Sequence, residues 1–120
     1  MKYLLDSNIL IYHLNGESTA TDFILENLYE CGISQITFVE ILSFDFTEQE
    51  AYQVETFLNC FEIIDTSKDI ARQCIKNRKI KRIKIPDNFI AATAQVNDLI
   101  LVTRNTDDFK QLDLNLKNIF

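Results

Sequence analysis

A continuous apolar block, Leu99 to Val102, most constrains how this chain can fold. A block of four apolar residues between polar segments is typical of a strand that is buried on both faces of a sheet. Pro86 and Asp87 precede it, followed by apolar and small side chains at helical spacing from Phe89 to Val96. The polar residues Thr103 to Asp108 come directly after it. The stretch therefore predicts a helix–strand unit with acidic residues at the start of the helix and just past the carboxyl end of the strand.

The same alternation of apolar blocks and helical stretches runs through the rest of the chain. Further strands are expected at residues 2–5, 33–36 and 60–65, with a possible last strand at 114–120. This order favours right-handed crossovers and an α/β fold, with a central, mostly parallel sheet of four to five strands and helices on both faces. The 120 residues are 47% hydrophobic, with two glycines and one proline. This length and composition suit a single domain that spans residues 1–120.

Apolar runs and cysteines indicate the compartment. No apolar run has the length that a bilayer crossing needs, and Asp6 interrupts the short apolar start, which argues against a secretory signal. Cys31, Cys60 and Cys74 are an odd number with no close pair and no metal-thiolate spacing. They suit reduced thiols that act as small buried hydrophobic residues. We therefore expect a cytoplasmic protein.

Basic residues are concentrated in one segment, although the net charge of the chain is −6. The basic strip has seven cations and no acid: Arg72, Lys76, Arg78, Lys79, Lys81, Arg82 and Lys84. A local basic strip on an acidic body can concentrate a polyanion such as RNA. Alternatively, it is a solvated helix face whose basic carboxyl-terminal end suits the helix dipole. The charge pattern alone supports the two interpretations equally.

Four acidic residues are expected at one edge of the sheet. Asp6, Glu40 and Asp108 follow the first, second and fourth strands, and Asp87 begins the last long helix. The carboxyl ends of parallel strands share an edge, so the first three face one crevice, and Asp87 reaches it if its helix begins there. Converging carboxylates raise each other's pKa, and a hard divalent cation such as Mg²⁺ or Mn²⁺ neutralises them. Such an ion can activate water for attack on a phosphodiester.

Some of these residues also have a purely structural interpretation. Asp6 is a good N-cap residue, and Thr37 and Glu40 have the spacing of a capping box. The lone histidine, His13, is expected to be packed or at the surface rather than to act as a general base. The chain has neither a GxxxxGK[ST] nor a GxGxxG motif, which argues against nucleoside triphosphate and dinucleotide binding.

Four segments together resemble the PIN domain family, and most of all the VapC-type toxins of bacterial toxin–antitoxin pairs: LLDSNILIYHLNG, ITFVEIL, IPDNFIAATA and LVTRNTDDF. The resemblance spans nearly the whole chain in the right order, and its first and last motifs are the specific ones. It implies a PIN-like three-layer sandwich and a metal-dependent ribonuclease that hydrolyses RNA phosphodiesters by water attack. It also implies an RNA substrate, a small antitoxin that covers the acidic cleft, and a homodimer, with no membrane partner.

The resemblance carries roles onto individual residues. It implies that Asp6, Glu40 and Asp87 are ligands of Mg²⁺ or Mn²⁺, and that Asp108 is the fourth acidic position. Asn105 and Asp107 are alternatives for that fourth position. The polar residues that support the site in the family correspond to Ser7, Asn8, Thr103 and Asn105.

Two other functions fit parts of the pattern. A receiver-like signalling domain needs paired acids after the first strand, where Asp6 stands alone, and a phosphoacceptor after the third strand, where Asp65 lies. A PIN fold kept as an RNA- or protein-binding scaffold without catalysis is expected to have lost an acid, and all four are present.

Overall fold

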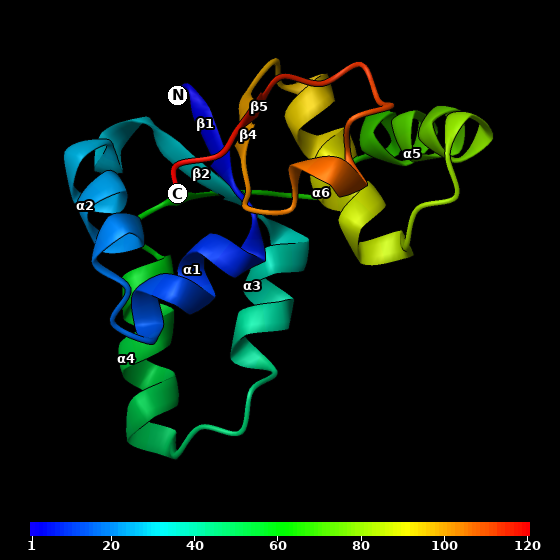
Figure 1. The fold of residues 1–120 in the computed structure, drawn as a ribbon. Helices are drawn as coiled ribbons and strands as arrows, with labels where there is room; N and C mark the ends of the chain where they lie inside the picture. Colours follow the sequence, from blue (N-terminus) through cyan, green and yellow to red (C-terminus); the bar gives the residue numbers. More distant parts are fainter.

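The computed structural model describes residues 1–120, with strands and helices alternating along the chain (Figure 1). The first half contains β1 (Tyr3–Leu5), α1 (Ser7–Leu14), α2 (Ser18–Glu26), the 3₁₀ helix η1 (Leu28–Glu30), β2 (Cys31–Ser34), α3 (Gln35–Leu42) and α4 (Glu48–Leu58). The second half contains β3 (Glu62–Ile64), α5 (Lys68–Ile80), α6 (Ile85–Val96), β4 (Ile100–Val102), the 3₁₀ helix η2 (Thr106–Asp108) and β5 (Leu116–Lys117).

The five strands form one sheet in the order β3-β2-β1-β4-β5, and every neighbouring pair is parallel. The chain moves outward from β1 to β3 on one side and then returns to place β4 on the other side of β1. The strand order therefore reverses between β1 and β4. In open α/β sheets, ligands bind in the crevice outside the carboxyl ends of the strands at such a reversal.

Helices cover both faces of this sheet, as the alternation predicted (Figure 1). Tyr3 and Leu5 of β1 belong to a core cluster that also holds buried residues of α1, α2 and α4. Leu4, which points to the opposite face, belongs to a second cluster with Ile90 and other residues of α6. Successive residues of a strand face opposite sides, so an uninterrupted apolar run suits a strand covered on both faces.

The second strand begins and ends earlier than the sequence pattern predicted. β2 spans Cys31–Ser34, and Ser34 Oγ accepts a hydrogen bond of 3.1 Å from the Ile36 amide, so Ser34 caps α3. The expected capping box of Thr37 and Glu40 is therefore wrong, since both residues lie inside α3. Ser34, the last residue of the strand, already caps the start of the helix. A capping box is present instead at the start of α4.

His13 packs at the junction of three helices, as expected for a lone histidine without a catalytic partner. Its Nδ1 lies 2.7 Å from Thr21 Oγ1 of α2, and its ring lies 4.8 Å from the Phe57 ring of α4. Burial lowers the pKa of His13. It is therefore part of the packing between α1, α2 and α4.

The cysteines are all free, and two of the three are buried as expected. Cys31 and Cys74 lie in the core, whereas Cys60 is exposed at the turn after α4, so the prediction of burial is wrong for Cys60. None of the helices combines the length and apolarity that a membrane crossing requires.

Candidate active site

Asp6 lies at the end of β1, at the point where the strand order reverses. Its Oδ1 accepts a hydrogen bond of 2.8 Å from the Ser7 amide as the N-cap of α1, and its Oδ2 accepts one of 2.8 Å from Thr103 Oγ1. Thr103 directly follows β4, so this bond joins the two strands on either side of the reversal. Asp6 is therefore both a cap and a buried carboxylate of the crevice, with an exposed fraction of 6%.

Ser7, which directly follows Asp6, holds the Glu40 side chain in place. Ser7 Oγ donates a hydrogen bond of 2.7 Å to Glu40 Oε1 and lies 3.1 Å from Thr37 Oγ1. Thr37 is completely buried, one turn before Glu40 on α3. These contacts fix the face of α3 that carries Glu40 against the start of α1.

Asp87 and Asp108 complete the acidic group from the other side of the sheet. Asp87 lies in the first turn of α6, and Asp108 ends η2. Both line a pocket of about 230 Å³ together with the connection between α5 and α6: Lys81, Arg82, Ile83 and Lys84. The last long helix therefore begins beside the segment that follows β4.

Burial and the charges of neighbouring carboxylates raise the pKa values of Asp6 and Asp87. Burial raises the pKa of Asp6 to about 6, against the hydrogen bonds from Thr103 and Ser7 that lower it, and the charges of Asp87 and Glu40 raise it further. Burial and then the charges of Glu40 and Asp108 raise the pKa of Asp87, with Lys84 acting weakly in the opposite direction. Four segments distant in sequence thus bring their carboxylates within electrostatic reach of one another.

The residues after β4 differ in their positions. Asp107 is exposed and forms an ion pair with Lys110, which lowers the pKa of Asp107. The Asn105 amide donates a hydrogen bond of 3.0 Å to Thr103 Oγ1. Asp108 is the member of this segment that lies beside Asp87 and raises its pKa.

The donor set suits a hard divalent cation. Asp6, Glu40, Asp87 and Asp108 offer oxygen ligands, and none of them forms a salt bridge. Asn8 donates to Asp6 and Thr103, while its own Oδ1 is buried without a hydrogen-bond partner. No three of the acidic side chains are already close enough to hold one ion together. The oxygen donors nevertheless fit Mg²⁺ or Mn²⁺ by their chemistry. Mg²⁺ keeps several of its waters in protein sites.

The basic strip divides into two parts. Lys81, Arg82 and Lys84 line the pocket that holds Asp87 and Asp108. Arg72 pairs with Asp69 on the exposed face of α5. The other three do not line the acidic pocket: Lys76, Arg78 and Lys79.

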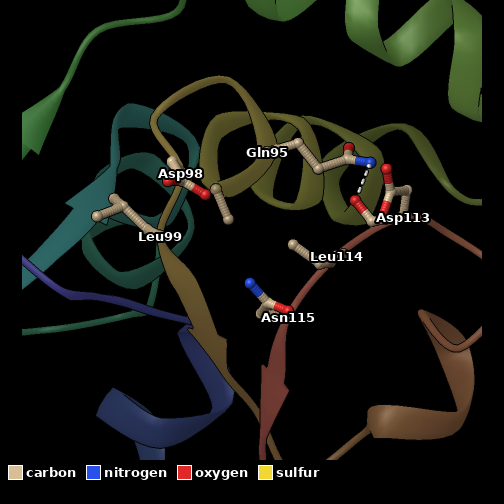
Figure 2. Close-up of a pocket in the computed structure, with 7 residues that line it drawn as sticks. Gln95, Asp98, Leu99, Asp113, Leu114 and Asn115 are labelled. Atoms are coloured by element: carbon tan, nitrogen blue, oxygen red, sulfur yellow. Dashed lines mark hydrogen bonds between the residues drawn. The ribbon is translucent and has the colours of Figure 1, made fainter.

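A second hollow lies at the amino-terminal ends of β4 and β5, opposite the ends that the acids follow (Figure 2). It has a volume of about 170 Å³, and its lining residues Leu99, Leu114 and Asn115 immediately precede β4 and β5. The Gln95 side chain donates a hydrogen bond of 3.1 Å to the Asp113 carbonyl at its rim. None of the four acids lines this hollow, so the crevice at the carboxyl ends is the candidate site.

All four acids that the sequence singled out lie in this region of the molecule, whereas two other expectations from the sequence differ from the structure. Thr37 was expected to cap a helix, and it instead contacts Ser7. Asp65, the phosphoacceptor of the receiver-like alternative, is exposed after β3 at the edge of the sheet, separated from β1 by β2. A receiver-like site needs the phosphoacceptor beside the acid of the first strand, so the strand order does not support this alternative.

Comparisons with known proteins agree with this architecture. The family model described as PIN domain matches residues 3–115. Ribonuclease VapC10 of Mycobacterium tuberculosis is 31% identical over 92% of this chain and 87% of that protein. A chain of a toxin-antitoxin complex from Klebsiella pneumoniae is 32% identical, with a TM-score of 0.89 and coverage of 99% of this chain and 98% of that one. A chain of DNA-bound VapBC from Salmonella typhimurium, at 21% identity, shares the fold with a TM-score of 0.87 and coverage of 100% and 99%.

Proposed function

The chain belongs to the PIN domain family, and from this premise we propose that it is a metal-dependent endoribonuclease, the toxin of a VapBC-type toxin–antitoxin pair. One observation carries the proposal: carboxylates from four separate segments gather at the strand-order reversal, and none of them forms a salt bridge. That arrangement is unfavourable for folding unless a bound cation offsets it. One relative is a ribonuclease, which supports RNA as the substrate. Another similar chain comes from a toxin-antitoxin complex, which supports the antitoxin partner. The homodimer stays a prediction.

Each residue of the crevice has a definite part in the proposed reaction. Asp6, Glu40, Asp87 and Asp108 would hold a Mg²⁺ or Mn²⁺, which would supply an activated water and stabilise charge on the phosphodiester. The Ser7 amide and Thr103 donate to the oxygens of Asp6 and favour its ionised form despite burial. Ser7 Oγ orients Glu40.

RNA cleavage by the purified chain tests this proposal directly. We expect single-stranded RNA to be cut in the presence of Mg²⁺ or Mn²⁺, with activity lost on addition of EDTA and restored by excess Mn²⁺. Cleavage that persists in EDTA would contradict the role of the metal. RNA binding without cleavage at any metal concentration would favour the scaffold alternative, in which the fold is retained and the chemistry is absent.

Substitution of Arg82 by Ala is expected to weaken RNA binding, because Arg82 lines the acidic pocket. We expect a loss of about three- to tenfold, and a slope of log affinity against log salt that is shallower by about one. Arg72→Ala is the matched control, since Arg72 is also exposed but pairs with Asp69 away from the pocket. Fluorescence anisotropy of labelled RNA, measured on an Asp6→Asn background to prevent cleavage, gives both quantities. Equal losses in the two variants would show that the whole strip binds RNA.

A further inference from the structure

The charged side chain of Lys81 donates hydrogen bonds to the backbone of the segment that carries Asp108. Its Nζ donates hydrogen bonds of 2.6 Å to the Asp108 carbonyl and 3.2 Å to the Asp107 carbonyl. The residue itself caps the carboxyl end of α5 and is partly buried. The two bonds therefore join the end of α5 to η2, across 27 residues of sequence.

η2 is short, and its other hydrogen bonds and its ion pair are local in sequence. The Asp108 amide bonds to the Asn105 carbonyl and the Phe109 amide to the Thr106 carbonyl, both at 3.1 Å, and Phe109 is buried in the core. The last carbonyls of a helix have no partner within the helix, and a lysine side chain can satisfy them. Lys81 meets this need from a neighbouring element.

We propose that Lys81 is a positioning residue that fixes Asp108 beside Asp87, rather than an RNA contact as the basic strip suggested. The inference rests on the proposed function, because the position of Asp108 matters only if the acids bind a metal. Lys81, Asp87 and Asp108 line the same pocket, and the Lys81 ammonium group donates to backbone carbonyls there.

The sign of one effect separates positioning from simple electrostatics. Removing a positive charge beside a cation site favours cation binding by Coulomb's law. Loss of the tether has the opposite effect, because a ligand that is no longer held in place must be ordered when the ion binds. Lys81→Met removes the charge and keeps the apolar stem, and Lys81→Arg retains the donors. Arg82→Met is the matched control, since Arg82 lines the same pocket and forms no hydrogen bond to η2.

Calorimetric titration with Mn²⁺ tests the proposal. We expect Lys81→Met to weaken Mn²⁺ binding about tenfold, Lys81→Arg to restore most of the loss, and Arg82→Met to leave binding unchanged or slightly tighter. On an Asp108→Asn background, Lys81→Met should have no further effect. Unchanged or tighter binding in Lys81→Met would overturn the positioning role alone, whereas no Mn²⁺ binding by the wild type would contradict the proposed function.

Hydrogen exchange gives a second readout that does not depend on the metal. In the metal-free protein, we expect the amides of Asp108 and Phe109 to exchange faster in Lys81→Met than in the wild type or in Arg82→Met. Unchanged exchange at these two amides would overturn the tether whether or not the chain binds Mn²⁺.

Discussion

Replacement of Asp6 by Asn is expected to abolish RNA cleavage and yet to stabilise the metal-free fold. Loss of a metal ligand should reduce the rate by about a thousandfold or more, since a metal contributes several kcal/mol of transition-state stabilisation. Burial raises the pKa of Asp6 to about 6, so its ionised form costs stability at neutral pH. Asn removes that cost and remains a good N-cap. It forfeits the bond accepted from Thr103, so we expect a gain of about 1–2 kcal/mol.

The pH dependence of this gain follows from the direction of the pKa shift. Because the pKa of Asp6 is raised from 3.8 to about 6, the folded state binds more protons than the unfolded state between these values. The stability of the wild type therefore rises relative to Asp6→Asn as the pH falls through 6, and the gap closes towards pH 4. Urea unfolding of both proteins in EDTA at a series of pH values measures the gap.

Divalent metal should reverse the order of stability at neutral pH. A ligand that binds only the folded state stabilises it, so Mn²⁺ should raise the free energy of unfolding of the wild type and leave Asp6→Asn unchanged. Asp107→Asn is the control, because Asp107 is exposed and paired with Lys110 outside the acidic group. A wild-type level of cleavage in Asp6→Asn, or equal loss in Asp107→Asn, would contradict the assignment of the site.

Replacement of Asn77 by Ala is expected to cause the largest loss of stability outside the apolar core. Asn77 is completely buried between α5 and α6. Its Nδ2 donates bonds of 3.0 Å to Asn88 Oδ1 and 2.8 Å to Gln95 Oε1, and its Oδ1 accepts one of 3.1 Å from Gln73. Ala leaves these partners unsatisfied, two of them on α6, at a cost of about 2–4 kcal/mol. Urea unfolding measures this loss.

Gln73→Ala is the matched control for the amide network, since it removes only one partner of Asn77 and Gln73 is partly exposed. We expect it to cost less than about 1 kcal/mol. Asn88 also donates to the Cys74 carbonyl and directly follows Asp87, so the network holds the start of α6 in place. A cost for Asn77→Ala no greater than that for Gln73→Ala would show that the network does not stabilise this packing.

Much of the candidate site could be predicted because its acids follow the ends of strands. Asp6, Glu40 and Asp108 come after apolar blocks, and parallel strands bring such positions to one edge. The position of Asp87 depended on where α6 begins relative to the sheet. Pro86 indicated the start of that helix, because proline is favoured in the first turn.

Other features depend on contacts between segments that no local pattern contains. Ser34 and Thr37 are both plausible caps, and the tertiary contact of Thr37 with Ser7 accompanies the use of Ser34 as the cap. Lys81 was grouped with its basic neighbours because charge patterning does not indicate what each side chain touches. Its bonds to η2 connect residues far apart in sequence. The role of Lys81 could therefore be assigned only once the position of α5 relative to the segment after β4 was known.

Crystals grown with Mn²⁺ and measured at the manganese absorption edge test the central claim most directly. We predict an anomalous peak in the crevice between Asp6 and Asp87, with Glu40 or Asp108 among its ligands, that is absent in crystals of Asp6→Asn. An anomalous peak only elsewhere on the molecule, or no peak at saturating Mn²⁺, would contradict a metal site shared by Asp6 and Asp87.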